Sequence, residues 1–390
     1  MKNISETGKC CSGCGICVSV CPVGAIHMKN RDGFLEPVIN SQCINCGKCL
    51  AICPAGKADE CTYRFFTEKR WGHSCNETIR REAASGGLTS ELLHYLISSK
   101  TVDYVITADH YKNDRSCGIC MPKDDSIYEK AGSRYCPVDM SDVISKIRDT
   151  EGTCAIVCLP CYARGIRRLM DMDSSLNKKV KYIISLLCNH VPSYHATEYL
   201  IKKYKTGEAD EIRYRGDGWF GHFRTYKNGK LIHSISFSEY FPTAFSRSFW
   251  RYSCILCKDH FGKSADICMG DADFIKHRFP EKENLGETFC FINNPALKNI
   301  LEHMEKDGII ELHADVSENE LESIYGDLCN ENRGGKEALR QDAASILRKE
   351  QWSCVTDIGK KYFSAVHSAL RSCKQNMTHS GHGKGKENEK

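Results

Sequence analysis

The fold of this chain is decided by two runs near its N-terminus, Cys11-Ser-Gly-Cys14-Gly-Ile-Cys17-Val-Ser-Val-Cys21-Pro22 and Cys43-Ile-Asn-Cys46-Gly-Lys-Cys49-Leu-Ala-Ile-Cys53-Pro54. Each run has the spacing C-x2-C-x2-C-x3-C-P, in which three thiolates bind one [4Fe–4S] cluster and the fourth binds a second cluster. We expect the fourth cysteine of each run to start a short helix that points it across to the other cluster. The first cluster set is then Cys11, Cys14, Cys17 and Cys53, and the second cluster set is Cys43, Cys46, Cys49 and Cys21.

These eight cysteines have two other conceivable uses, a disulfide framework and a pair of zinc sites. Zinc sites are closed by two distant C-x2-C pairs, not by four cysteines that end in proline, so the spacing favours iron–sulfur clusters. The two runs form an internal repeat, with a hairpin turn expected at Asp32-Gly33 between them. We therefore predict that residues 1–60 form a bacterial 2[4Fe–4S] ferredoxin-like domain.

Composition narrows the class of protein. A chain of 390 residues with 41% hydrophobic and 27% charged residues is ordinary for two or three globular domains. The net charge of +4 comes without a basic block, so nucleic acid is not an expected partner. No run of about 18 apolar residues predicts a membrane span, and no signal peptide precedes Cys10. With 25 cysteines, the chain is expected in a reducing cytoplasm, where thiolates bind metal.

A glycine-rich turn, Ser85-Gly86-Gly87, precedes a stretch with apolar residues at helical spacing from Leu88 to Ile97. Backbone N–H groups at such a helix start attract anions, and Arg80-Arg81 lie just upstream. The turn therefore predicts either a site for the phosphate of a nucleotide cofactor or an ordinary helix cap.

Further cysteines fall at the ends of predicted strands. Cys161 follows the apolar run 154–159, and Cys188 ends the apolar run 181–188. If these strands are neighbours in an open α/β sheet, both cysteines lie at its carboxyl edge, where such sheets build their sites. Cys254 and Cys257, spaced C-x2-C, can complete a third cluster set. Other cysteines compete for these positions: Cys136, Cys154, Cys158 and Cys268.

From Arg80 to about Asp271 the chain resembles the β subunit of coenzyme F-420-reducing hydrogenase and its relatives, which include formate dehydrogenase β subunits and hydroxymethyl chlorophyll reductase. The matching pieces are Ser85-Gly86-Gly87, Pro160-Cys161, Leu187-Cys188-Asn-His-Val191-Pro192-Ser193, Arg213-Tyr-Arg215 with Gly218-Trp219, Cys254-x-x-Cys257 and Ala265-Asp266-Ile-x-x-Gly270-Asp271. The resemblance implies a fold in which FAD binds near the Ser-Gly-Gly turn, beside a third [4Fe–4S] cluster held by Cys161, Cys188, Cys254 and Cys257.

The neighbours of these cysteines depart from the family pattern. The family usually has Gly-Thr-Pro-Cys-Gln where this chain has Cys158-Leu159-Pro160-Cys161-Tyr162, and Cys-His-Gly where it has Cys188-Asn189-His190. After Gly270-Asp271 the usual Phe-Trp-Gly is replaced by Ala272-Asp273-Phe274. The resemblance therefore implies a redox relay more firmly than it implies a particular substrate.

We predict an α+β and α/β architecture. Its parts are the ferredoxin-like domain at 1–60, a connector at 61–76, a mixed α/β flavin-binding catalytic domain divided into 77–160 and 161–372, and a disordered tail at 373–390. Expected partners are a redox protein or ferredoxin and a small two-electron substrate, with a homo-oligomer as a further expectation.

The predicted function is that of an iron–sulfur flavoprotein oxidoreductase, which exchanges electrons between clusters and a hydride substrate such as coenzyme F-420. His190 and Asp271 are candidate proton donors. One alternative is a non-catalytic electron-transfer subunit that delivers electrons to a partner reductase or biosynthetic enzyme. Another is an interaction or redox-sensing protein whose clusters are structural.

Overall fold

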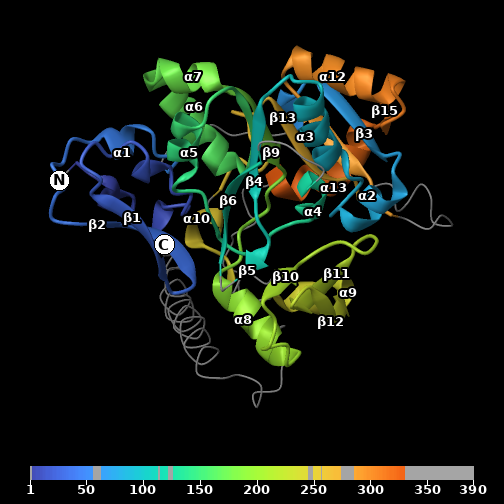
Figure 1. Ribbon diagram of the computed structural model, residues 1–390, viewed down its shortest axis with the longest axis horizontal. Coiled ribbons are helices and arrows are strands. Elements are labelled where there is room, and N and C mark those ends of the chain that lie inside the picture. Colours follow the sequence, from blue (N-terminus) through green and yellow to red (C-terminus); the bar gives the residue numbers. More distant parts are fainter. Residues whose placement is uncertain are drawn as a thin grey trace, which may run out of the picture.

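The computed structural model describes residues 2–55, 63–112, 115–121, 126–244, 249–255, 257–273 and 285–329. These residues form an N-terminal module, a large mixed sheet covered by helices on both faces, and a small antiparallel sheet beside it (Figure 1). The mixed α/β class is as predicted. The expected tail at 373–390, the residues 330–372 and the first two residues of the predicted connector, 61 and 62, lie outside the described residues.

The N-terminal module is built on a hairpin and short helical turns. Its elements are η1 (Ile4–Cys10), η2 (Ile16–Val18), β1 (Ile26–Arg31), β2 (Phe34–Ile39) and α1 (Lys48–Ala51). Strands β1 and β2 pair antiparallel around Asp32 and Gly33, whose φ angles of 48° and 80° confirm the predicted turn. The predicted helix position was wrong, because Cys21 and Cys53 follow η2 and α1. Each helix begins instead after a glycine in the left-handed region, Gly15 or Gly47.

The large sheet places the ends of its parallel strands at one edge. Its order is β15 (Ile310–His313), β3 (Glu68–Ser74), β14 (Thr288–Ile292), β13 (Ile267–Asp271), β9 (Val180–Leu186), β8 (Cys154–Cys158), β4 (Tyr104–Ala108), β6 (Ser116–Met121) and β7 (Val138–Asp139). The four central strands β13, β9, β8 and β4 are mutually parallel. The predicted neighbouring strands before Cys161 and Cys188 are β8 and β9, so both cysteines lie at the same carboxyl edge.

Helices cover both faces of this sheet because its central strands are apolar on both sides. In β8, Cys154, Ile156 and Cys158 pack toward one layer of helices, and Ala155 and Val157 pack toward the other. The first layer contains α5 (Val143–Asp149), α6 (Pro160–Met172) and α7 (Ser174–Lys179). The second contains α3 (Leu88–Ser98), α4 (Ser126–Glu129) and α12 (Pro295–Lys306). Helix α3 confirms the helix predicted after the Ser-Gly-Gly turn.

A small antiparallel sheet extends from the main body. Its order is β12 (Lys230–Ser236), β11 (His222–Lys227), β10 (Glu211–Arg213) and β5 (Tyr111–Lys112), and α8 (Tyr194–Lys203) and α9 (Phe237–Ala244) pack on it. Strands β11 and β12 form a hairpin that turns at Asn228-Gly229. Residues 245–248, which follow α9, lie outside the described residues.

The remaining elements are η3 (Tyr63–Phe65), α2 (Glu77–Glu82), α10 (Tyr252–Ile255) and α13 (Glu318–Cys329). Helix α13 packs through Leu321 and Tyr325 on an aromatic cluster with Phe261, Phe289 and Phe291. Within the described ranges, no helix has the length and the apolar character needed to cross a bilayer.

Candidate functional site

The first cluster set comes together inside the N-terminal module. Burial raises the pKa of Cys14 to about 11, and the charges of Cys11 and Cys53 raise it further. Burial also raises the pKa of Cys17, followed by effects of Cys14, Cys11 and Cys53. Thiols that raise one another's pKa lie close together, so the fold brings the first four predicted residues to one place. Two of the sulfurs accept backbone N–H groups, from Gly13 to Cys11 at 3.4 Å and from Ala55 to Cys53 at 3.4 Å.

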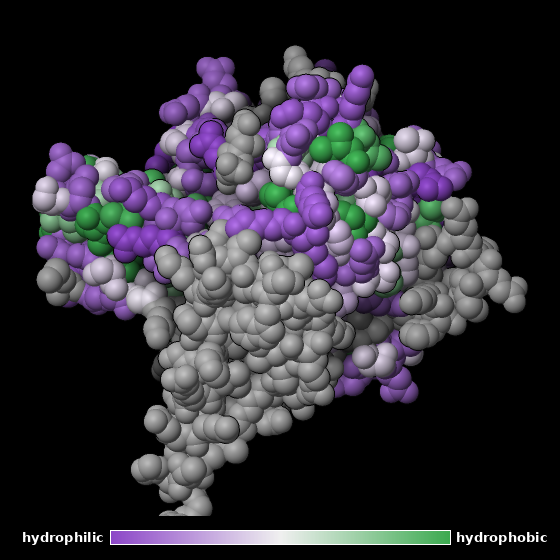
Figure 2. Space-filling view, turned by 90° about the horizontal axis from the view of Figure 1, so that it is seen from below, coloured by the Kyte–Doolittle hydropathy of each residue, from purple (hydrophilic) through white to green (hydrophobic). Residues whose placement is uncertain are grey.

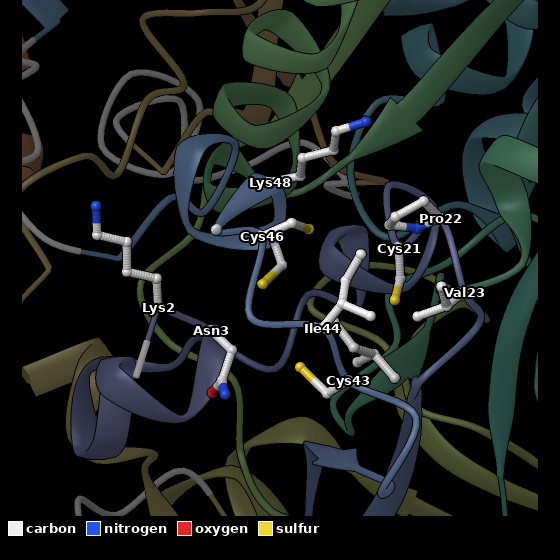
Figure 3. Close-up of a pocket in the computed structure, with 12 residues that line it drawn as sticks. Lys2, Asn3, Cys21, Pro22, Val23, Cys43, Ile44, Cys46 and Lys48 are labelled. Carbon is white, nitrogen blue, oxygen red and sulfur yellow. The ribbon is translucent and has the colours of Figure 1, made fainter.

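The second cluster set lines a single pocket (Figure 3). Cys21, Cys43, Cys46 and Cys49 all border it, together with Asn3, Val23, Ile44, Lys2 and Lys48. Cys46 is exposed, Cys21 and Cys43 are half-buried, and Cys49 is buried. Lys2 belongs to the N-terminal end of the chain, which Figure 1 places at the edge of the molecule away from the main sheet. The second set is therefore the outer one.

The third cluster set assembles at the carboxyl edge of the main sheet. Burial raises the pKa of Cys188 well above its usual value, and the charges of Cys254, Cys161 and Cys257 raise it further. Burial raises the pKa of Cys254 to about 11. Cys161, Cys188, Cys254 and Cys257 are each half-buried as whole residues, whereas burial is the main influence on the thiols of Cys161, Cys188 and Cys254. Desolvated thiols need positive charge to become thiolates, and the irons of a cluster would supply it. The residues present therefore fit a third cluster.

The first and third sets are adjacent. After burial, the largest influence on the pKa of Cys161 is the charge of Cys14. Helix α6, which carries Cys161, packs on η2 so closely that a Cβ on Gly165 would lie 3.0 Å from Ile16. The same helix sends Arg168 to the carbonyl oxygen of Cys53. The two sets thus belong to one continuous interior region that spans the module and the sheet.

A [4Fe–4S] cluster is bound by four cysteines, which must surround a larger group than one ion. Across the described ranges, no three His, Cys, Asp or Glu side chains converge as they would around one metal ion. The choice between clusters and zinc rests on the cysteine spacing of the two N-terminal runs.

The Ser85–Gly87 turn is tightly packed. Gly86 accepts a hydrogen bond from the backbone N–H of Ser74 at 2.7 Å, and a Cβ on it would lie 2.4 Å from the carbonyl oxygen of Gly72. Ser85 shares a hydrogen bond of 3.0 Å with Thr288. Gly87, at φ 86°, caps α3 without a side-chain hydrogen bond. Close packing against the sheet explains why residue 86 is a glycine. The part of the turn that suits an anion is the uncapped first turn of α3.

A buried polar cluster lies beside this turn. Arg215 is 2% exposed and donates to Tyr135 at 2.9 Å, to Asp271 at 3.1 and 3.2 Å, and to the carbonyl oxygen of Ala84. Trp219 donates its indole N–H to Asp271 at 3.2 Å. The Nε atom of Arg215 is buried without a hydrogen-bond partner in the described structure. An orphaned guanidinium N–H beside Ser85, with an indole next to it, fits a bound polar aromatic group.

This polar cluster is joined to the third cluster set through the strand ends. The backbone N–H of Leu187, the residue before Cys188, donates to the carbonyl oxygen of Met269 at 2.7 Å. Gly270 is so close to Leu187 that a Cβ on it would lie 2.6 Å from that side chain. Asp271 is the next residue after Gly270 and the last of β13. The end of β13 therefore connects Cys188 to Arg215 and Trp219.

The two candidate proton donors, Asp271 and His190, contact other side chains of the site. Asp271 accepts hydrogen bonds from Arg215 and Trp219, which suits an anchoring carboxylate. His190 stacks on Trp250 at 3.9 Å between ring centroids. Two arginines that sequence reasoning did not single out, Arg215 and Arg251, prove to be buried at the centre of the site. The signal for Arg215 was its place in the Arg213-Tyr-Arg215 motif, whereas no motif included Arg251.

Family models match most of the chain. The model for the coenzyme F-420 hydrogenase/dehydrogenase beta subunit N-term matches residues 71–145, and that for the C terminus of the same protein matches residues 152–318. A 4Fe-4S dicluster domain model matches residues 10–58.

Similar proteins come from methanogens. The chain is 23% identical to one of the subunits of the F(420)H(2) dehydrogenase of Methanosarcina mazei over 278 residues, which are 67% of this chain and 75% of that protein. It is 22% identical to the coenzyme F-420-dependent sulfite reductase of Methanocaldococcus jannaschii over 292 residues, 70% of this chain and 44% of that protein. A chain in the F-420-reducing [NiFe] hydrogenase complex of Methanosarcina barkeri shares the fold, with a TM-score of 0.52, 16% identity, and coverage of 71% of this chain and 93% of that one.

Proposed function

The chain belongs to the family of coenzyme F-420 hydrogenase/dehydrogenase beta subunits, and from that premise we propose that it is an iron–sulfur flavoprotein oxidoreductase. It has an N-terminal 4Fe-4S dicluster domain. The observation that carries the proposal is the order of the cysteine sets. They run from the outer second set through the first to the third, and the third lies beside the Arg215–Asp271 pair.

Each set is proposed to bind one [4Fe–4S] cluster. The first cluster takes Cys11, Cys14, Cys17 and Cys53, the second takes Cys21, Cys43, Cys46 and Cys49, and the third takes Cys161, Cys188, Cys254 and Cys257. Backbone N–H donors to Cys11, Cys21 and Cys53, at 3.2 to 3.4 Å, supply the hydrogen bonds to sulfur that help to set reduction potentials.

FAD is proposed to bind beside the third set. The uncapped first turn of α3 and the orphaned Nε–H of Arg215 are the donors offered to its polar groups, and Trp219 offers an aromatic surface. When bound, FAD supplies the exchange between a hydride and single electrons. Asp271 holds both Arg215 and Trp219 in place, and Tyr135 fixes the other side of the guanidinium.

The two-electron substrate is proposed to be coenzyme F-420 or a similar hydride carrier, because that coenzyme appears in the names of all three similar proteins. Oxidation of reduced coenzyme F-420 releases two electrons and two protons, one of them within the hydride. Clusters held by the third, first and second sets would accept these electrons one at a time and pass them to a one-electron acceptor. The reverse reaction takes up two electrons and two protons.

The outer cluster is the proposed contact with a redox partner such as a ferredoxin. Val23 and Ile44 border its pocket and are 39% and 61% exposed. Figure 2 shows small hydrophobic areas interrupting an otherwise hydrophilic surface at the end of the molecule that the N-terminal module forms. Lys2 and Lys48 flank the pocket, whose described lining contains no carboxylate. An apolar contact with a basic rim suits an acidic protein.

The test is to purify the full chain without oxygen and to analyse its cofactors. We expect about twelve iron atoms per chain, four for each cluster, and one FAD released by heat. Reduced coenzyme F-420 should then bleach the visible absorption of the clusters. About eight iron atoms would remove the third cluster, and a colourless supernatant would refute the flavoprotein.

A second candidate function is a non-catalytic electron-transfer subunit, and the packing of the Ser-Gly-Gly turn favours it. Gly86 is fully accounted for by its contacts with Gly72 and Thr288, so the turn has a structural reason to exist. Turnover of coenzyme F-420 with a viologen dye by the isolated chain would exclude this candidate. Cluster reduction without such turnover would support it.

A further inference from the structure

We propose that Arg251 is a positioning residue that holds the first cluster set against the third and raises the reduction potentials of both clusters. The part that concerns the third cluster rests on the proposed function. The part that concerns the first cluster rests only on the dicluster domain. The structural basis is one residue whose buried guanidinium bonds to the loop of Cys11 and whose backbone begins the turn that carries Cys254.

Arg251 reaches from the main body into the N-terminal module. It lies directly before α10, where its carbonyl oxygen accepts the backbone N–H of Cys254 at 3.0 Å. Its side chain donates to the carbonyl oxygen of Cys11 at 3.1 Å and to that of Leu35 at 2.7 Å. The guanidinium carbon also lies 4.6 Å from the ring centroid of Phe34. Arg251 thus forms a hydrogen bond with a predicted ligand of the first cluster and with a predicted ligand of the third.

The Cys11–Cys14 loop is shaped to receive this side chain. Gly13 has φ of +72°, and a Cβ there would lie 2.7 Å from Nη2 of Arg251 and 2.6 Å from the carbonyl oxygen of Leu35. Any larger residue would push the guanidinium out. The glycine in this position therefore leaves room for the arginine as well as for the loop's backbone conformation.

The charge of Arg251 is weakly neutralised by protein groups. The residue is only 6% exposed. In the described structure its ion-pair partner is Glu36, at 4.0 Å, and the side chain of Glu36 is 42% exposed. A buried cation is costly without a nearby anion. A cluster bound by the set of Cys11 and one bound by the set of Cys254, each with net negative charge, would provide that anion.

The same electrostatics predict an effect on reduction. A cluster becomes more negative when it accepts an electron, so a fixed positive charge nearby stabilises the reduced form. The guanidinium of Arg251 donates to the carbonyl oxygen of Cys11, and Cys254 lies three residues further along the turn that Arg251 begins. The first and third clusters should therefore accept electrons more readily than they would without it. The residues that line the pocket of the outer second set include no arginine.

The experiment compares three variants of the full chain by iron analysis and by redox titration monitored by electron paramagnetic resonance. In Arg251→Gln we expect the first and third clusters to become harder to reduce, by about tenfold in the reduction equilibrium, or about 59 mV for one electron. The second cluster should not change. Arg251→Lys keeps the charge and should stay near the wild-type potentials. Arg168→Gln, which removes a cation that contacts Cys53, should affect the first cluster alone.

Each result decides the proposal. Unchanged potentials in Arg251→Gln with full iron content would overturn it, as would equal shifts in the Lys and Gln variants. If Arg251→Gln loses iron, Glu36→Gln replaces it, because it changes the charge beside Arg251 at a half-exposed residue. Removing that carboxylate should make the first cluster easier to reduce, and no change would refute the electrostatic role. The wild-type protein could instead contain about eight iron atoms, with the potential of its first cluster still shifted in Arg251→Gln. That result would rule out the third cluster and leave the role of Arg251 at the first cluster intact.

Discussion

The N-terminal module and the carboxyl edge of the main sheet collect cysteines in opposite ways. The module gathers eight of them from residues 11–53, and the second set opens to solvent at Cys46. The sheet edge gathers four from residues 161–257, and burial desolvates the thiols of Cys161, Cys188 and Cys254. A local set is assembled by loops and survives almost any neighbouring structure. A set gathered from distant positions exists only if the whole sheet forms.

This contrast separates the tasks of the two regions. The exposed set suits exchange of single electrons with another protein, because short distance to the surface matters there. The buried set suits a site that must exclude water, as the proposed binding of a flavin and its substrate would require. The first set, which contacts both regions through Cys14 and Arg251, is the connection between them.

The same contrast explains what could be predicted from sequence. The ferredoxin spacing specifies its ligands within two short runs, so the module and its hairpin were predicted closely. The strands β8 and β9 were predicted because their apolar runs are unbroken, and their parallel pairing then placed Cys161 and Cys188 together. Within the module, the prediction that each fourth cysteine starts a helix was wrong, since the left-handed Gly15 and Gly47 fix where each helix begins.

The parts that could not be predicted depend on burial of charge. No motif marks Arg251, and the motif that contains Arg215 does not show that it is buried, because burial of a cation requires partners that the fold brings from distant positions, such as Asp271 for Arg215. The Ser-Gly-Gly turn shows the converse case. Its pattern suggests a phosphate site, whereas close contact of Gly86 with β3 and β14 also requires glycine. Pattern alone does not separate these two reasons.

The largest predicted effect tests whether the two regions hold their clusters independently. Cys257→Ser should lose about four of twelve iron atoms and leave both clusters of the module intact. Cys46→Ser should lose a similar share from the second set and leave the third unchanged. Iron analysis combined with electron paramagnetic resonance distinguishes the two losses.

Cys290→Ser is the matched control, because Cys290 is fully buried in β14 and belongs to none of the three sets. Its iron content should equal that of the wild type. Loss of iron from all sets in Cys257→Ser would mean that the regions assemble together and would contradict the separation. An unchanged iron content would rule Cys257 out as a ligand.

A smaller effect is expected where the module meets a partner. Lys48→Glu should slow reduction of the clusters by an acidic ferredoxin about three- to tenfold at low salt, because it removes attraction at the rim of the pocket. The difference should shrink near 1 M salt, where screening reaches about 3 Å. Stopped-flow absorbance measures the rate.

Lys230→Glu makes the same change of charge on the exposed end of β12 in the small sheet and should leave the rate near that of the wild type. Reduction by dithionite should be equal in all three proteins, since a small reductant does not need the docking surface. Equal slowing by both variants would show that net charge, not the surface around the outer cluster, controls association.

The smallest effect compares one capping asparagine in each region. Asn3 is 6% exposed, accepts the backbone N–H of Ser5 at 3.0 Å and donates to Asn45 at 2.7 Å beside the second set. Asn294 has the same role at α12, accepting the N–H of Ala296 at 2.9 Å. Replacing either by Ala should cost about 1 kcal/mol. Only Asn3→Ala should speed the release of iron from the second cluster to a chelator, by about fivefold if release follows local opening of the module. If Asn294→Ala speeds that release as much, opening of the main sheet controls it, and the module does not retain its clusters as an independent unit.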